Sequence, residues 1–331
     1  MTLYDLPAPA KLNLFLHVVG KRDDGYHSLE TLFRLISLSD SISLDLSLHS
    51  GITRETNLNE LLPEQDDLVV RAARALQVAT GTCLGAHISV NKRIPAGGGL
   101  GGGSSDAATV LIGLNRLWRC GLNRTQLMQI GLTLGADVPF FIFGQSAFAQ
   151  GVGELLTPVA LPTQSYIVIE PSQSVATQKV FGAPDLTRNS EHVKITDFPV
   201  GGSFVRSAPY GFGKNDLQPV VFREYPVVFA AYNWLCQAGL ETRLSGSGSC
   251  LFSEHSSPSE ALKAREVLLM TMSGSKSIVS KSIASKSIAS KSSTRCKSII
   301  TQVRSGTGNA IKQLFACDGY AEHPLRCWVN D

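Results

Sequence analysis

A glycine-rich segment from Pro95 to Asp106 is the part of the chain whose residues most clearly predict chemistry. Residues 97–103 hold six glycines in seven positions, and Ser104, Ser105 and Asp106 follow them. Glycine lets the backbone adopt positive φ and approach a ligand closely. Apolar residues at helical spacing come next, so a helix begins here and presents unpaired N–H groups and the positive end of its dipole. The sequence therefore predicts an anion site, most often one for phosphate.

Three other interpretations fit this loop less well. A dinucleotide-binding pattern of the form Gly-x-Gly-x-x-Gly matches almost automatically in so dense a run, and no acidic residue ends a second strand about 20 residues later. A Walker A loop ends in Gly-Lys-Ser/Thr, whereas Gly103 is followed by two serines and the loop has no lysine. A flexible linker does not need Ser-Ser-Asp at a helix start. A dinucleotide-binding oxidoreductase remains the alternative from another functional class.

The periodicity of the apolar residues predicts the elements that position the loop. Alternation of apolar and polar residues indicates strands at 12–18, 41–48, 88–90 and 166–170. Asp24-Gly25 is a turn sequence and predicts a hairpin around residues 21–26. Helices are expected where a capping residue precedes an apolar pattern, namely after Asp66, after the glycine loop with Asp106 in the first turn, from Thr125 to Gly135, and after Ser257.

Charge is distributed unevenly along the 331 residues, a length that suggests two domains. The formal net charge is +3, but residues 273–304 hold seven Lys and Arg and no acid, so +3 less these seven leaves −4 for the rest. The same segment repeats Ser-Lys-Ser-Ile with a period of five, which suits neither a helix nor a strand and predicts a low-complexity insertion. We expect no nucleic-acid or membrane partner; binding of either through these lysines is the minor alternative.

The cysteines and the N-terminus indicate the compartment. The seven cysteines are scattered and form no Cys-x-x-Cys pair, which argues against a disulfide framework or a zinc site and favours a reducing environment. The first residues do not follow the pattern of a signal peptide, and no apolar run approaches about 18 residues. We therefore expect a cytoplasmic protein.

Three segments resemble the motifs of the galactokinase, homoserine kinase, mevalonate kinase and phosphomevalonate kinase (GHMP) superfamily. Pro95–Asp106 is similar to its second motif, Pro9–Leu14 to its first, and Arg243–Ser249 to its third. Further strings resemble the branch whose members phosphorylate the 2-hydroxyl of 4-diphosphocytidyl-2-C-methyl-D-erythritol, in the non-mevalonate route to isopentenyl diphosphate. These strings are residues 22–27, 135–141, 151–154 and 215–219. Another small-molecule kinase of the superfamily, of the homoserine kinase type, is the alternative within this class.

The resemblance implies an α+β GHMP kinase fold of two domains. Residues 1–157 would form an N-terminal domain similar to domain 2 of ribosomal protein S5 and would carry the phosphate loop. Residues 158–331 would form a ferredoxin-like C-terminal domain that contains the insertion at about 273–304, a segment without a counterpart in the family pattern. The active site would lie between the domains of a monomer or homodimer. The cofactors implied are ATP and Mg²⁺, for which no protein ligand is firmly assigned.

The resemblance also implies a role for individual residues. Lys11 and Asp137 would be catalytic. Asp137 would accept the proton of the substrate hydroxyl or orient that hydroxyl. Lys11 would orient Asp137 and the substrate hydroxyl and would stabilise developing charge. Asn13 shares a strand face with Lys11. Tyr26 would stack on cytosine with Phe181 on its other side, while His27 would hydrogen-bond the ring. The residues implied at ATP are Lys92, Pro95, Ala96, Gly97, Gly98, Gly99, Leu100, Gly101, Gly102, Gly103, Ser104 and Ser105.

Two of these assignments have open points. The hydroxyls of Ser104 and Ser105 are equally suited to bind phosphate, to ligate Mg²⁺ or to cap the helix. Asp67 stands where the family commonly has an asparagine near adenine, so that contact departs from the family pattern.

Overall fold

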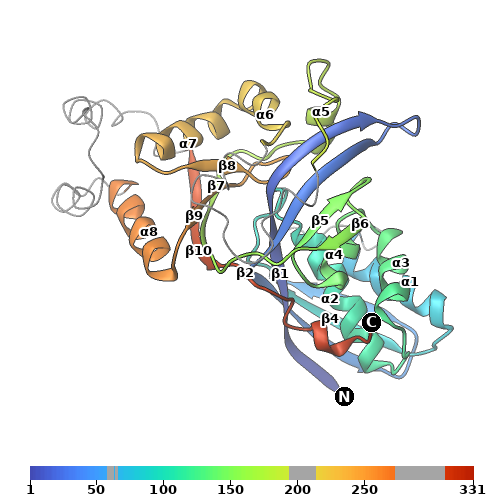
Figure 1. Cartoon of the computed structure of the whole chain (residues 1–331). Coiled ribbons are helices and arrows are strands. Elements are labelled where there is room, and N and C mark those ends of the chain that lie inside the picture. The colour runs from blue at the N-terminus through green and yellow to red at the C-terminus, as the bar shows by residue number, and fades with distance from the viewer. Residues whose placement is uncertain (58–62, 64–65, 194–213, 273–309) are drawn as a thin grey trace, which may run out of the picture.

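The computed structural model describes residues 1–57, 63, 66–193, 214–272 and 310–331. The insertion predicted at 273–304 lies outside them. The rest forms two sheets that carry helices (Figure 1). The six-stranded sheet has the order β3-β4-β2-β5-β6, with β1 paired to β2. Its strands are β1 (Thr2–Lys21), β2 (His27–Ser47), β3 (Ile52–Thr56), β4 (Gly85–Asn91), β5 (Ala147–Gln150) and β6 (Leu155–Pro158).

The long hairpin of β1 and β2 runs through both halves of the molecule (Figure 1). Its turn closes where the sequence predicts, with Lys21 opposite His27 and the Arg22 N–H donating to the Tyr26 carbonyl at 2.8 Å. Leu6 packs in the N-terminal core, whereas Leu16 packs in the C-terminal core. The hairpin therefore belongs to both cores and fixes one relative to the other.

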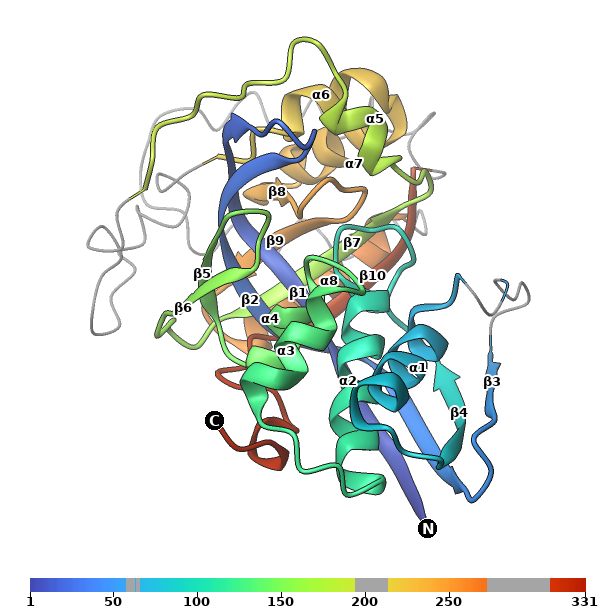
Figure 2. The same cartoon turned by 90° about the vertical axis from the view of Figure 1, so that its right-hand side faces the viewer.

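Helices cover one face of the N-terminal sheet (Figure 2). They are α1 (Leu68–Thr80), α2 (Gly102–Leu117), α3 (Arg124–Leu132) and α4 (Val138–Phe143). The helices expected at α1, α2 and α3 are confirmed, although α3 ends at Leu132 and not at Gly135. The short helix α4 was not predicted.

The cap of α1 lies one residue after the predicted cap, and the cap of α3 lies two residues before the predicted cap. Asp67, not Asp66, accepts the Val69 N–H at the start of α1. Asn123, not Thr125, caps α3 and forms a capping box with Gln126. In both cases the residue immediately before the first helical residue has an extended backbone, and its side-chain oxygen lies near the first free N–H groups of the helix. Asp106 lies beyond the first turn of α2 and is buried.

The C-terminal sheet has four antiparallel strands in the order β10-β7-β9-β8, as expected for a ferredoxin-like domain. The strands are β7 (Ser165–Pro171), β8 (Thr242–Leu244), β9 (Leu251–His255) and β10 (Ile311–Asp318). Its helices are α5 (Thr177–Phe181), α6 (Gln218–Glu224), α7 (Pro226–Gln237) and α8 (Pro258–Met272). Ser257 caps α8 as predicted, because its hydroxyl accepts the Glu260 N–H at 3.3 Å.

The last residues of the chain return to the N-terminal half. After β10, residues 319–331 reach the N-terminal core, where Leu325 and Val329 are buried, and a short 3₁₀ helix lies at Arg326–Trp328. The buried Arg124 fastens this tail: its guanidinium donates to the carbonyls of Arg326 at 2.9 Å and Val329 at 2.8 Å. The tail thus crosses from the sheet of the second half into the core of the first.

Six described cysteines are free thiols. Among the helices of the described ranges, none is long and apolar enough to cross a membrane.

We predict that Arg124→Met lowers the free energy of unfolding by about 2–4 kcal/mol, because it leaves buried carbonyls without their charged donor. Urea unfolding of the purified protein measures this. Asp331→Asn is the matched control, since Asp331 is the exposed partner of the same guanidinium and its replacement should leave the midpoint unchanged. Equal midpoints for both variants would contradict the proposed anchoring.

Candidate active site

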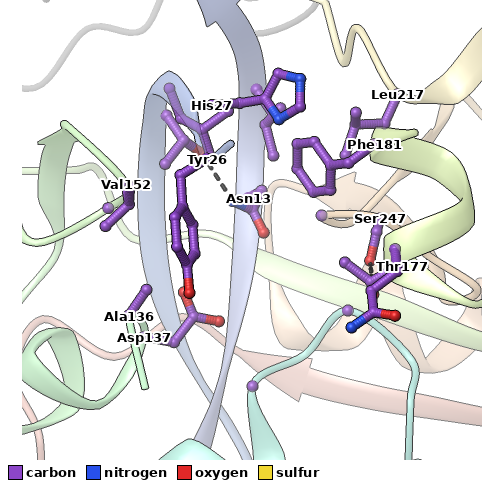
Figure 3. Close-up of a pocket in the computed structure, with 18 of the residues that line it drawn as sticks. Asn13, Tyr26, His27, Ala136, Asp137, Val152, Thr177, Phe181, Leu217 and Ser247 are labelled. Atoms are coloured by element: carbon purple, nitrogen blue, oxygen red, sulfur yellow. Dashed lines mark hydrogen bonds between the residues drawn. The ribbon is translucent and has the colours of Figure 1, made fainter. Parts of the chain in front are cut away.

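The glycine loop separates two cavities. One, of about 700 Å³, is lined by residues of the β1–β2 hairpin, of α5 and of the segment just before α4 (Figure 3). The other, of about 450 Å³, is lined by residues of β3, α1 and the end of β4. Gly97, Gly99, Gly101 and Ser104 line both cavities. A ligand in one cavity can therefore meet a ligand in the other across the loop.

The backbone of the loop adopts conformations that favour glycine. Gly97, Gly99 and Gly101 have φ of 66°, 74° and 71°. A Cβ on Gly99 would lie 2.1 Å from the Ser245 carbonyl oxygen. Gly101 precedes α2 and supplies no side-chain cap, so the first N–H groups of the helix are left for an anion.

The loop is fastened to the other two motifs by hydrogen bonds. The Lys11 N–H donates to the Leu100 carbonyl at 2.9 Å. The hydroxyl of Ser245 donates to the Gly99 carbonyl at 3.1 Å and accepts the Asn13 N–H at 3.3 Å. Three motifs that are far apart in the sequence thus meet at one place.

The two serines of the loop differ in their surroundings. Ser105 is fully buried, and its hydroxyl donates to the Pro9 carbonyl at 2.6 Å. Ser104 faces both cavities. Of the two hydroxyls, that of Ser104 is the one a ligand can reach.

Lys11, Asn13 and Asp137 lie together at the floor of the larger cavity. The Lys11 Nζ donates to Asn13 Oδ1 at 2.5 Å and lies 3.6 Å from Asp137 Oδ2. The Asp137 side chain is one-third exposed and caps no N–H of α4. Burial lowers the pKa of the Lys11 ammonium, and the charge of Asp137 offsets part of that decrease. The arrangement holds a reachable carboxylate beside a buried ammonium, which suits the orientation of a hydroxyl group.

The aromatic side chains of Tyr26, His27 and Phe181 also line this cavity (Figure 3). The rings of His27 and Phe181 have centroids 5.2 Å apart. Tyr26 lies in the hairpin turn and is 64% exposed, so one face of its ring is open to a ligand. Arg188 donates to His27 Nε2 at 3.0 Å; the sequence analysis did not identify this arginine.

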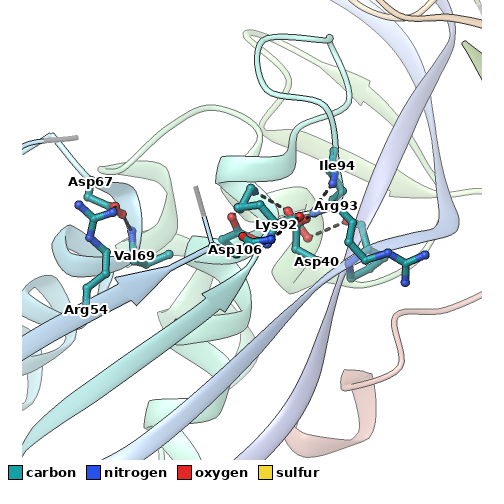
Figure 4. A network of polar contacts seen from close by, with 11 residues as sticks. Asp40, Arg54, Asp67, Val69, Lys92, Arg93, Ile94 and Asp106 are labelled. Atoms are coloured by element: carbon teal, nitrogen blue, oxygen red, sulfur yellow. Dashed lines mark hydrogen bonds and ion pairs between the residues drawn. The ribbon is translucent and has the colours of Figure 1, made fainter. Parts of the chain in front are cut away.

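Lys92 lies in a wall of the smaller cavity within a network of charges (Figure 4). Its Nζ donates to carboxylates of Asp40 and Asp106. Asp40 also accepts the N–H of Ile94 at 2.8 Å, which holds the strand end that leads into the loop. Burial lowers the pKa of Lys92, but the two carboxylates outweigh it and the pKa is raised. Lys92 is therefore a charged link between strand, loop and helix.

Asp67 is also engaged by protein groups (Figure 4). Its carboxylate accepts the Val69 N–H at 2.9 Å and pairs with Arg54 at 2.6 Å. The aspartate that departs from the family pattern thus caps α1 and is neutralised by an arginine of β3.

Comparisons with known proteins agree with this arrangement. The models of the GHMP kinases N terminal domain and GHMP kinases C terminal domain match residues 67–145 and 206–273. The 4-diphosphocytidyl-2-C-methyl-D-erythritol kinase of Bordetella bronchiseptica is 52% identical over 329 residues, 99% of each chain. The chain belongs to this family of GHMP kinases.

Other relatives give the same result. The kinase of the same name from Azoarcus sp. is 52% identical over 255 residues, 77% of this chain and 86% of the relative. A crystal structure of 4-(cytidine 5'-diphospho)-2C-methyl-D-erythritol kinase matches with a TM-score of 0.63 and 37% identity, over 81% of this chain and 95% of that chain. Homoserine kinase from Cytophaga hutchinsonii, at 15% identity and a TM-score of 0.59, shares the fold.

Family membership confirms the expected fold and a small-molecule kinase activity, and gives no support to the oxidoreductase alternative. The alignment with the Bordetella kinase extends over nearly the whole of both chains. That range spans residues 273–304.

We predict that Gly99→Ala lowers the free energy of unfolding by about 2–4 kcal/mol, because it adds overpacking against Ser245 to the cost of a left-handed backbone. Gly97→Ala is the matched control: its φ is also positive, but its Cβ would meet nothing within 4 Å, so only about 1 kcal/mol is lost. Urea midpoints compare the two. Equal losses would show that the loop does not depend on its close approach to Ser245.

Proposed function

We propose that this kinase transfers the γ-phosphate of ATP to the 2-hydroxyl of 4-diphosphocytidyl-2-C-methyl-D-erythritol, in the non-mevalonate route to isopentenyl diphosphate. The observation that carries the proposal is the placement of Lys11 and Asp137 between an anion cradle and an aromatic pocket within one continuous site. The names of relatives at 52% identity support the same substrate.

ATP occupies the smaller cavity in this proposal. Its phosphates lie against the N–H groups of the loop and of α2, with the Ser104 hydroxyl beside them. The adenosine end lies toward Asp67 and Leu68, which line the same cavity. Lys92 lies in the wall of this cavity, where it holds Asp40 and Asp106 beside the start of α2.

Mg²⁺ enters the site with the nucleotide. Within the described ranges, no three His, Cys, Asp or Glu side chains are grouped to hold a metal. This fits Mg²⁺, which keeps several waters and is bound largely through substrate phosphates. Ser104 is the side chain in position to join them, because its hydroxyl faces both cavities. When bound, the ion neutralises charge on the transferring phosphates.

The acceptor hydroxyl lies beside Asp137. Phosphoryl transfer asks the protein mainly for positioning and charge stabilisation. The Asp137 side chain is one-third exposed, so its carboxylate is available to accept a hydrogen bond from the hydroxyl and then the proton of that hydroxyl. Lys11 is held by Asn13 and Asp137, so its ammonium stays in place as negative charge develops.

The cytidine end lies between Tyr26 and Phe181, with His27 at its edge. Stacking of a base on an aromatic ring is worth about 1–3 kcal/mol. A homoserine kinase acts on a substrate without a base, and would leave this aromatic end of the cavity unused. The cluster of Tyr26, His27 and Phe181 therefore favours the cytidine substrate within the family.

We predict that Asp137→Asn lowers kcat about 10²–10⁴-fold, because the amide cannot take the proton, while ATP binding persists. ADP release from the cytidine diphosphate substrate measures turnover, and calorimetry with a non-hydrolysable ATP analogue measures binding. Asp185→Asn is the control, because Asp185 is an exposed residue that pairs with Arg223 on the surface and should keep full turnover. Near-normal turnover of Asp137→Asn would overturn the catalytic role assigned to Asp137. Absence of turnover by the unaltered enzyme would overturn the proposed substrate.

A further inference from the structure

Arg188 lies outside the residues expected in the site, yet it contacts two of them. Its Nε donates to His27 Nε2 at 3.0 Å. Its Nη2 donates to the carbonyls of Phe181 at 3.0 Å and Ala183 at 2.7 Å, and its Nη1 donates to the Leu186 carbonyl at 3.1 Å. One half-buried guanidinium thus holds the imidazole at the start of β2 and the backbone at the end of α5. These are two walls of the same cavity (Figure 3).

The contact with Arg188 determines which nitrogen of His27 carries the proton. A guanidinium has only donors and stays protonated in proteins. His27 Nε2 must therefore accept, and a neutral imidazole whose Nε2 accepts carries its hydrogen on Nδ1. Burial and the positive charges of Arg188 and Lys21 lower the pKa of His27, which favours this neutral form.

The remaining nitrogen is available to a ligand. Among the described residues, no protein group hydrogen-bonds His27 Nδ1, while the ring lines the cavity beside Phe181. The cavity therefore presents a fixed N–H donor at its aromatic end. Cytosine offers acceptors at N3 and O2 to such a donor, whereas uracil carries a hydrogen on N3. A donor facing the N3–H of uracil leaves two buried donors unpaired, which costs binding.

We propose that Arg188 is a positioning residue that sets base specificity: by occupying Nε2 of His27 it presents Nδ1–H to cytosine and disfavours uracil. The inference rests on the proposed function, because it takes the cytidine end of the substrate to lie between Tyr26 and Phe181. Arg188 also keeps Phe181 in place through its backbone, so one side chain maintains both the stacking wall and the hydrogen-bond donor.

The first test uses the free enzyme and no substrate. Nitrogen chemical shifts of labelled histidine report which ring nitrogen is protonated, and His27→Gln assigns the signals. We expect a protonated Nδ1 in the unaltered protein and in Arg188→Lys, which keeps a charged donor. Arg188→Met should give a mixture of tautomers. Arg223→Met is the matched control, since Arg223 lies in exposed surface pairs outside the cavity, and should leave His27 unchanged.

The second test measures specificity with the full-length enzyme. The ratio of kcat/KM for the cytidine diphosphate substrate to that for its uridine counterpart should fall about tenfold or more in Arg188→Met. Most of the change should lie in KM, because the base is remote from the transferred phosphate. A purely structural loss would lower both substrates alike and leave the ratio unchanged.

The outcomes separate this inference from the proposed function. A protonated Nε2 in the unaltered protein, or an unchanged tautomer and ratio in Arg188→Met, would overturn the role of Arg188. Failure of the unaltered enzyme to phosphorylate the cytidine substrate would overturn the proposed function instead, and the tautomer experiment on the free enzyme would still stand. If Arg188→Met does not fold, as thermal melting would show, a tautomer ratio in Arg188→Lys equal to that of free histidine would count against the inference.

Discussion

The pairing of β1 with β2 is the constraint on which the rest of the structure depends. A strand directs successive side chains to opposite faces, so this single ladder places apolar residues in two cores and polar residues in the site between them. Ala8 is buried in the N-terminal core and Val18 in the C-terminal core, while Lys11 and Asn13 lie between them and face the cavity. The hairpin turn then adds Tyr26 at the far end of the same cavity. A slip of one residue in the register would turn Lys11 away from Asp137.

A buried lysine, Lys11, and a half-buried lysine, Lys92, lie beside the glycine loop, and each is stabilised in its charged form by different neighbours. Lys11 is 4% exposed and has one carboxylate nearby, together with the amide of Asn13 and the Phe33 ring at 5.0 Å. Lys92 has two carboxylates. Desolvation disfavours an isolated ammonium, and opposite charges restore it. The less compensated lysine, Lys11, lies at the floor of the larger cavity, whereas the charge of Lys92 is balanced by two carboxylates of the protein.

The sequence predicted those features that depend on short-range pattern. The period of two in residues 12–18 was enough to place Lys11 and Asn13 on one face, and glycine density was enough to identify the loop that lies between the two cavities. The meeting of Asp137 with Lys11 came only through the family resemblance, because nothing in local pattern brings α4 to β1. The caps at Asp67 and Asn123 were misplaced by one or two positions, since neighbouring residues there can all cap a helix. Arg124 and Arg188 escaped prediction because the partners that matter, the carbonyls of the tail for Arg124 and the His27 ring for Arg188, are far away in the sequence.

The end of the chain is fixed by contacts made by β10 and by the tail that follows it. The hydrogen bonds that hold β10 beside β7 are unaffected by the length of the segment that precedes it. Beyond β10, Arg124 anchors the tail in the N-terminal core at 2.8–2.9 Å from two of its carbonyls. β10 is thus held by β7 at its side and by the anchored tail that follows it, both through contacts among the described residues.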